Sequence, residues 1–333
     1  MTHSGLTKSR IDLIFKVVDD LVHHNCSVVR DGYGNTSISI RSVLHPDAII
    51  AYNKSALLIT TSNYKSVLLN ESTKRDYDEV IGIGNVSVID VAKHLSYKFD
   101  KKLVIIPSIL SNDSFCTDRV TGNCSRSWRA MYPHEVIIDL QRISETPVKI
   151  NCLGIGEFIG LYVSYMDYCV SQNEIVDARV IGFISSSYKQ LVGNRWENDT
   201  DKLKFLSICL IFKCLIMRLH SNHQIGCGID HTLAKALEKM YNFPHGIAVC
   251  WGCAISLAMF PNWSNTDMSL STFLKASSII GQPIDFAADQ LATNLESIVA
   301  LAKEIRPLER SCINGLSNNQ IKNAKRKLWD TLS

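Results

Sequence analysis

The strongest constraint on the fold is an alternation of short apolar runs and amphipathic helical stretches in the first part of the chain. Continuous or β-branched runs predict strands at 26–31, 55–62, 78–84, 101–108 and 134–140. Helical spacing of apolar residues predicts helices at 10–24 and 87–99. The run "KKLVIIPS" (101–108) suits a strand covered on both faces. The sequence therefore predicts an α/β domain with a parallel, Rossmann-like sheet.

After Pro147 the pattern changes to long helical stretches. They are predicted at 154–171, 202–220, 230–241, 246–260, 287–304 and 317–331. We expect an α/β domain over residues 1–148, an all-α domain over 149–333, and a cleft between them.

Composition excludes several classes of protein. The net charge is only +3, with no basic stripe interleaved with aromatic residues, so we expect no nucleic-acid partner. The most apolar stretch, 205–219, is too short for a membrane span and contains Lys213, so we expect no membrane partner. The first ten residues lack the apolar core of a signal peptide, and eleven scattered cysteines suggest reduced thiols, which together predict a cytoplasmic location. Cys250 and Cys253 have redox-motif spacing, but core packing is favoured.

The stretch "GIGNVSVIDVAK" (82–93) joins a predicted strand to a predicted helix. Glycines at 82 and 84 let the backbone approach an anion, and the helix start directs N–H groups toward it. Ser87 can cap the helix or donate to a phosphate oxygen. A strand–helix turn that binds nothing is the alternative, because two glycines alone are a weak motif.

This turn resembles the "GxGGGSxxDxAK" turn of the family that contains glycerol-1-phosphate dehydrogenase, glycerol dehydrogenase and dehydroquinate synthase, within the iron-containing alcohol dehydrogenase superfamily. Three further stretches resemble the family in the same order: "IPSILSNDSF" (106–115), "PHEVIIDLQRISETPVKINCLGIGE" (133–157) and "DHTLAKALEKMYNFPHG" (230–246). The matches extend over about 165 residues, whereas the first 75 residues match poorly.

The resemblance implies a site for NAD or NADP in the first domain. Its residues would be Gly82, Gly84, Asn85, Val86, Ser87, Asp90, Pro107, Ser108 and Ser111. Asn85 and Val86 replace two glycines of the family pattern. Asn85 tolerates a positive φ and could keep the backbone shape of a glycine. The branched Val86 would crowd a pyrophosphate, which predicts weak binding, a changed pose or loss of the site.

Glu157, His231 and His245 align with the metal ligands of the family. One carboxylate and two imidazoles suit one divalent ion; we expect zinc, with iron as the alternative. Any single histidine is more often a surface or hydrogen-bonded residue, so this assignment depends on the resemblance. Lys235 and Ile247 replace a frequent histidine and a frequent glutamate of the family.

Two residues are candidates for catalysis. The resemblance implies that Asp113 contacts the substrate polyol and that Ser111 and Asn112 lie beside the nicotinamide. The alternative is an Asx-type turn after a strand. Lys235, one helical turn after His231, could hold a phosphate or acid group of the substrate.

The resemblance implies a metal-dependent, NAD(P)-linked oxidoreductase acting on a secondary alcohol of a small polyol or polyol phosphate. The first alternative is a cyclase like dehydroquinate synthase, which uses NAD transiently, but cations expected for its phosphate are missing at Gly160 and within 223–229. The second alternative is a catalytically silent binding protein. A homodimer is a further expectation.

Overall fold

The chain divides into two compact units. The structure, a computed structural model, describes residues 8–42, 56–69, 77–121, 127–193, 197–220, 222–281, 284–305 and 311–332. The sheet unit covers Leu6–Asn151 together with Glu197–Leu215, and the helical unit covers Cys152–Trp196 together with Ile216–Ser333. The sequence prediction assigns 197–215 to the second domain instead.

The sheet unit is built on a six-stranded sheet in the order β1-β2-β8-β5-β4-β3. Its strands are β1 (Cys26–Asp31), β2 (Gly34–Arg41), β3 (Ala56–Thr60), β4 (Glu79–Gly84), β5 (Lys102–Pro107) and β8 (Glu135–Asp139). The five strands from β2 to β3 are parallel, which confirms the predicted α/β class. The sheet is mixed, because at one edge β1 pairs antiparallel with β2. Only Gly32 and Tyr33 join these strands, and two residues form a hairpin but cannot make a parallel crossover.

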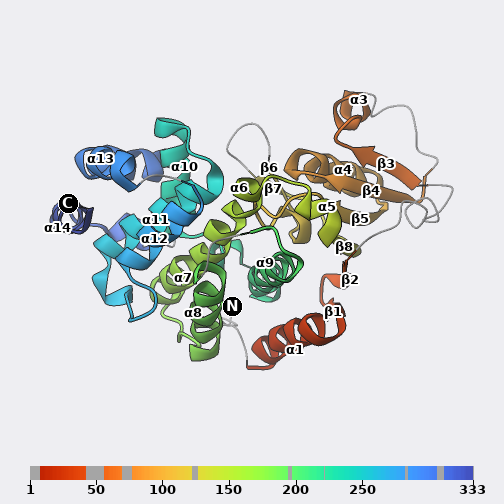
Figure 1. The fold of residues 1–333 in the computed structure, drawn as a ribbon, viewed down its shortest axis with the longest axis horizontal. Coiled ribbons are helices and arrows are strands. Elements are labelled where there is room, and N and C mark those ends of the chain that lie inside the picture. Colours follow the sequence, from red (N-terminus) through yellow and green to blue (C-terminus); the bar gives the residue numbers. More distant parts are fainter. Residues whose placement is uncertain are drawn as a thin grey trace. The chain divides into compact units, whose positions relative to one another are not determined.

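The central strands β4, β5 and β8 are buried on both faces, whereas β1 and β2 expose alternate residues. One face carries a cluster of buried residues, Ile81, Ile83, Val104, Ile106 and Ile137. Helix α4 (Val86–Phe99) packs along β4 and β5, and α1 (Lys8–His24) packs beside β1 (Figure 1). Shorter elements complete the unit: α3 (Tyr64–Leu69), η1 (Ser114–Cys116), β6 (Arg119–Thr121), β7 (Ser127–Arg129), α5 (Leu140–Ser144) and α6 (Val148–Asn151).

The first three-quarters of α9 (Thr200–His220) pack within the sheet unit. The ring of Phe212 lies 5.7 Å from that of Phe15 in α1, and Nζ of Lys204 donates to the carbonyl of Val22 across 2.9 Å. Just before the helix, Nδ2 of Asn198 donates to the carbonyl of Ser144 across 3.2 Å. These contacts explain why the segment belongs with the sheet although it begins almost sixty residues after the last strand of the sheet.

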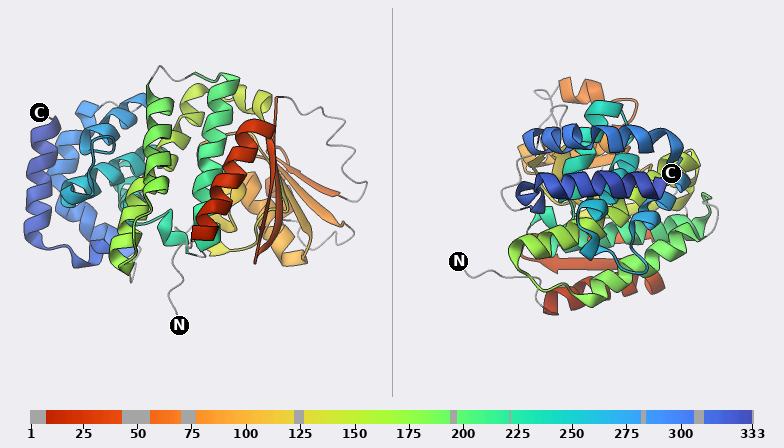
Figure 2. Two further views of the ribbon diagram at one scale, coloured as in Figure 1. Left: turned by 90° about the horizontal axis from the view of Figure 1, so that it is seen from below. Right: turned by 90° about the vertical axis from the view of Figure 1, so that its left-hand side faces the viewer.

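The helical unit confirms the predicted all-α second half in the residues described. Its elements are α7 (Leu153–Gln172), α8 (Ala178–Val192), η2 (His223–Ile225), α10 (Ile229–Tyr241), α11 (His245–Met259), η3 (Pro261–Trp263), α12 (Leu270–Ile279), α13 (Ile284–Ile305), η4 (Cys312–Gly315) and α14 (Asn318–Leu332). Helix α11 is central: it is buried from Gly246 to Met259 and packs on α7, α10, α12 and α14 (Figure 2).

Most of the cysteines that the structure describes are buried. Cys250 and Cys253 are both buried in α11, and burial raises the pKa of the Cys250 thiol, as core packing requires. No cysteine among the described residues forms a disulfide. In the same residues, no helix is both long and apolar enough to cross a membrane.

Candidate metal centre and cofactor turn

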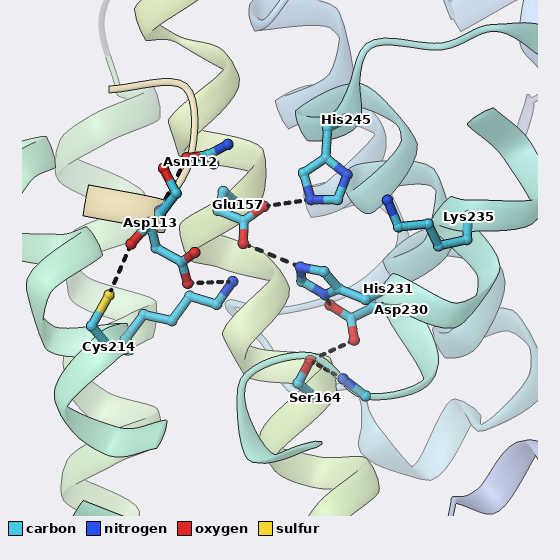
Figure 3. Close-up of polar contacts among 12 residues, drawn as sticks. Asn112, Asp113, Glu157, Ser164, Cys214, Asp230, His231, Lys235 and His245 are labelled. Atoms are coloured by element: carbon cyan, nitrogen blue, oxygen red, sulfur yellow. Dashed lines mark hydrogen bonds and ion pairs between the residues drawn. The ribbon is translucent and has the colours of Figure 1, made fainter. Parts of the chain in front are cut away.

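Glu157, His231 and His245 lie together in the helical unit, on α7, α10 and α11 respectively (Figure 3). Oε1 of Glu157 lies 3.1 Å from Nε2 of His231, and Oε2 lies 3.1 Å from Nε2 of His245. The two imidazole rings are 5.5 Å apart between centroids. The structure therefore brings the three predicted ligands to one point. Their role as ligands stays a prediction.

Close backbone contact between α7 and α11 positions two of these side chains. A Cβ atom on Gly156 would lie 2.2 Å from the carbonyl oxygen of Gly246, and a Cβ on Gly246 would lie 2.2 Å from that of Leu153. Only glycine fits at both positions. Because Glu157 follows Gly156 and His245 precedes Gly246, this contact brings their side chains together.

Each histidine has a second carboxylate at its other ring nitrogen. Nδ1 of His231 lies 2.8 Å from Oδ2 of Asp230, and Nδ1 of His245 is hydrogen-bonded to Oε1 of Glu238. A carboxylate can only accept, so each Nδ1 donates a proton and each Nε2 faces Glu157. The Nε2 atom then carries either a second proton or a bond to a cation. This carboxylate–histidine arrangement is the one that orients imidazole ligands in metal sites.

The charges around His245 favour a cation. Burial alone would lower the pKa of His245, but the carboxylates of Glu157 and Glu238 outweigh it and the pKa lies above its usual value. Burial alone would raise the pKa of Glu238, but the hydrogen bond from His245 and the charges of His245 and Lys235 bring it to about 2. The negative charge of Glu157 and Glu238 is therefore more than neutral imidazoles could balance, and the site favours a bound cation or protonated histidines.

The separations of Glu157 from the two histidines are close to those around a single divalent ion. Two N or O ligands about 2.0–2.2 Å from a tetrahedral zinc ion lie roughly 3.3–3.5 Å apart. Both Glu157–histidine separations are 3.1 Å but involve different carboxylate oxygens, so His245 must shift toward His231 for one ion to bind all three side chains. Glu157 and His231 are 2% and 4% exposed, which shields such a site from water.

Lys235 lies on α10, one turn after His231, as predicted. Its Nζ forms an ion pair with Oε2 of Glu238 across 3.0 Å, and Glu238 also holds His245. Lys235 is therefore connected to the centre through Glu238. Its predicted contact with substrate stays a prediction.

In the sheet unit, the predicted cofactor turn lies between β4 and α4. Gly84 has φ +157°, and a Cβ atom there would lie 2.8 Å from Cγ2 of Val88. Gly82 serves a different purpose from the predicted tight turn: a Cβ there would lie 2.7 Å from Cβ of Ala92, so Gly82 lets α4 pack on β4. The predicted positive φ of Asn85 is wrong. Its φ is −81°, and its side chain accepts from the N–H of Val88 as the N-cap of α4.

The remaining residues of the predicted cofactor turn differ in exposure. Val86 is half-buried in the first turn of α4, and Ser87 is exposed there but is not the N-cap. Asp90 is buried and its Oδ2 accepts from the N–H of Thr121 across 2.8 Å. Burial raises the pKa of Asp90 to about 6, against the opposing charge of Lys93. The carboxylate of Asp90 therefore stabilises the position of β6 through its hydrogen bond with Thr121.

The end of β5 lies beside the turn. Pro107 pairs with Gly84, and the N–H of Ser108 donates to the carbonyl of Gly84 across 2.9 Å. Parallel strands end at the same sheet edge, and ligands of such sheets bind there. Ser111, half-buried, follows three residues later. The structure thus groups Gly84, Val86 and Ser108 at one edge, and their contact with a cofactor stays a prediction.

Asp113 is held by α9 within the sheet unit. Nζ of Lys213 lies 3.3 Å from Oδ2 of Asp113, and the thiol of Cys214 donates to the Asp113 carbonyl across 3.4 Å (Figure 3). Lys213 has no exposed surface. The alternative of an Asx-type turn has support too, because Oδ1 of Asn112 accepts from the N–H of Ser114 across 3.0 Å.

Sequence reasoning missed four residues around these sites: Asp230, Glu238, Cys227 and Lys213. The Asp230-His231 pair is a usable signal, since an acid beside a ligand histidine can fix its tautomer. Lys213 was noticed only as a charge in an apolar stretch, and a buried lysine requires a partner.

Comparisons with known proteins agree with the motifs. Residues 47–147 match the model of a family described as iron-containing alcohol dehydrogenase. A protein of Methanoregula boonei named glycerol-1-phosphate dehydrogenase is 26% identical over 253 residues, 71% of this chain and 68% of that protein. One of Pyrobaculum aerophilum with the same name is 27% identical over 311 residues, covering 85% and 87%. The solved structure of a probable glycerol dehydrogenase from Sinorhizobium meliloti has a TM-score of 0.66 at 15% identity, over 89% of this chain and 97% of that chain. These findings confirm the resemblance and the fold.

Proposed function

We propose that this chain, a relative of the glycerol-1-phosphate dehydrogenases with the fold of the iron-containing alcohol dehydrogenases, is a metal-dependent, NAD(P)-linked oxidoreductase. Its substrate would be a secondary alcohol of a small polyol or polyol phosphate. The observation that carries the proposal is the position of Glu157, whose two carboxylate oxygens each face Nε2 of a histidine 3.1 Å away. The names of the two sequence relatives support the substrate class.

Glu157, His231 and His245 would hold the metal. The chemistry that a divalent ion supplies there is to polarise the substrate hydroxyl and lower its pKa. Asp230 and Glu238 keep the Nδ1 protons in place, so that both imidazoles present Nε2. Burial of Glu157 and His231 limits the access of water. Zinc is the proposed metal and iron the alternative.

The turn after β4 would hold the dinucleotide, which accepts a hydride from the substrate carbon. The glycine at 84 gives the backbone its positive φ, and the first turn of α4 offers N–H groups and the positive end of the helix dipole. Asn85 already satisfies one of these groups, that of Val88. Val86 adds a branched side chain that the pattern of the family lacks.

Lys235 is the proposed contact for a phosphate or acid group of the substrate, since its side chain is a quarter exposed. Asp113 stays the proposed contact for the polyol. A homodimer and a cytoplasmic location also remain proposals.

The cyclase alternative is disfavoured by the packing at Gly160. A Cβ atom there would lie 2.6 Å from Cγ1 of Val249 and 2.9 Å from Oδ2 of Asp230. A lysine at this position would displace the carboxylate that orients His231. This site therefore favours a reaction that expels no phosphate.

The electron balance tests the reaction type. A dehydrogenase converts one NAD(P)⁺ to NAD(P)H per substrate, whereas a cyclase regenerates its cofactor and releases phosphate. Incubation with NAD(P)⁺ and polyols or polyol phosphates should accumulate reduced cofactor stoichiometrically, without free phosphate. Phosphate release from a sugar phosphate with no net change at the nicotinamide absorbance would contradict the dehydrogenase and support the cyclase. Bound metal without turnover on any such substrate would support the silent binding protein.

A further inference from the structure

A cysteine, whose thiolate is a common metal ligand, lies beside Glu157 and His231. Cys227 occupies the turn between η2 and α10 and is 6% exposed. Its Sγ, a carboxylate oxygen of Glu157 and a ring nitrogen of His231 all lie within 4.8 Å of one another. Thiolate, carboxylate and imidazole are all ligands of zinc.

Hydrogen bonds from three consecutive backbone N–H groups hold the turn that contains Cys227. The N–H of Cys227 donates to the carbonyl of His223 across 3.1 Å. The next two N–H groups, of Gly228 and Ile229, donate to Ser164 and Asp167 of α7 across 2.8 and 3.0 Å. Gly228 allows this contact, because a Cβ there would lie 2.9 Å from Oδ2 of Asp167.

Helix α7 therefore anchors both the cysteine and the histidine. The hydroxyl of Ser164 accepts a hydrogen bond from the N–H of Gly228 and donates one to Asp230, which in turn is hydrogen-bonded to His231. Glu157 lies two turns earlier on the same helix. The thiol, the imidazole and the carboxylate are thus positioned by one element before any ion binds.

We propose that Cys227 is a ligand of the metal centre, alongside Glu157, His231 and His245, and that its sulfur makes the centre selective for zinc over iron. This inference rests on the proposed function, which supplies the metal. Binding of the ion would form a metal–sulfur bond and release the thiol proton to solvent.

Distance, charge and ligand chemistry support this assignment. Ligands of one tetrahedral zinc ion lie roughly 3.3–3.8 Å apart when one of them is sulfur, so Cys227, Glu157 and His231 need shifts of about 1 Å, and His245, which lies outside this cluster, must move toward it. One carboxylate and one thiolate balance the two charges of the ion. Soft thiolate ligands select zinc, whereas carboxylate and imidazole alone discriminate little between zinc and ferrous iron.

X-ray absorption at the zinc edge of the zinc-loaded full chain tests the proposal. We expect one sulfur at about 2.3 Å in addition to nitrogen and oxygen ligands. Cys227→Ser should lose the sulfur signal but keep zinc. The matched control is Cys169→Ser, a buried cysteine of α7 located twelve residues, or about 18 Å, along the helix from Glu157, and it should keep the sulfur signal.

Competition between zinc and ferrous iron gives a second measurement. Cys227→Ser should lower the preference for zinc about tenfold or more relative to the unaltered chain and to Cys169→Ser. Bound zinc with only nitrogen and oxygen ligands in the unaltered chain would overturn the cysteine assignment and leave the proposed function standing. A chain that binds ferrous iron but no zinc would likewise overturn only the cysteine assignment, and a chain that binds neither metal would overturn both.

Discussion

Asp230 accepts a hydrogen bond from Nδ1 of His231 across 2.8 Å, and this contact determines which ring nitrogen faces Glu157. Asp230 has no exposed surface, and its other oxygen accepts from the hydroxyl of Ser164. The carboxylate therefore acts on the centre through His231, as a positioning residue.

Asp230→Asn should weaken metal binding about 10–100-fold, because an amide can present its NH₂ group to Nδ1 and reverse the tautomer. Titration with zinc, followed by calorimetry, measures this change. Asp330→Asn, an exposed change on α14, is the control and should leave the affinity unaltered. Equal zinc affinities for Asp230→Asn and the unaltered chain would show that the hydrogen bond does not tune the centre.

Val86 should limit the affinity for dinucleotide. Val86→Gly removes the branched side chain and should tighten binding of NAD(H) or NADP(H) about three- to tenfold, or 0.7–1.4 kcal/mol. Val86→Ala removes the same methyl groups without the backbone entropy of glycine in a helix, so it separates crowding from fraying. Unchanged or weaker binding in both folded variants, measured by calorimetry, would contradict a pyrophosphate site at this turn.

Lys213→Met should destabilise the sheet unit by about 3 kcal/mol, because the buried carboxylate of Asp113 loses the cation 3.3 Å away. The measurement is denaturant unfolding of the single variants and of the pair. Asp113→Asn combined with Lys213→Met should recover much of the loss, since no buried charge is then left without its counterion. Strictly additive single effects would argue against energetic coupling of the two residues.

Asp90 should make stability depend on pH in a defined window. Its pKa is raised from 3.8 to about 6, so between about pH 4 and 6 the folded chain binds a proton that the unfolded chain has lost. Stability from this residue is therefore present at low pH and lost as pH rises, by roughly 2–3 kcal/mol in total. Asp90→Asn should remove that loss, so its stability relative to the unaltered chain rises from pH 4 to 7. A relative stability that stays constant over this range in denaturant unfolding would contradict the assignment.

Local patterns were sufficient for most of the secondary structure. The predicted strand at 26–31 matches β1, and the predicted helices at 154–171 and 230–241 match α7 and α10 to within one residue at each end. Strand β2 was missed because its exposed positions include Gly34, Asn35 and Ser37, residue types that are typical of loops. Helix α8 was missed as well, and its three consecutive serines lower helix propensity.

Residues of the site could be predicted from the sequence only where they belong to a motif that resembles the family. Glu157, His231 and His245 were found by resemblance and lie together. Cys227 and Lys213 were not assigned, because Glu157 is 70 residues from Cys227 in the chain and Asp113 is 100 residues from Lys213, and only the fold brings these pairs close. Asn85 was misinterpreted because asparagine suits both a positive φ and an N-cap, and the sequence does not distinguish the two.

Metal content of the purified chain tests the metal centre most directly. After growth with zinc and iron, elemental analysis should give about one divalent ion per chain. His231→Ala and His245→Ala should each lose most of this metal, while circular dichroism shows nearly unchanged helical content. Retention of full metal stoichiometry by both variants, or no more than trace metal in the unaltered chain, would contradict a centre formed by Glu157, His231 and His245.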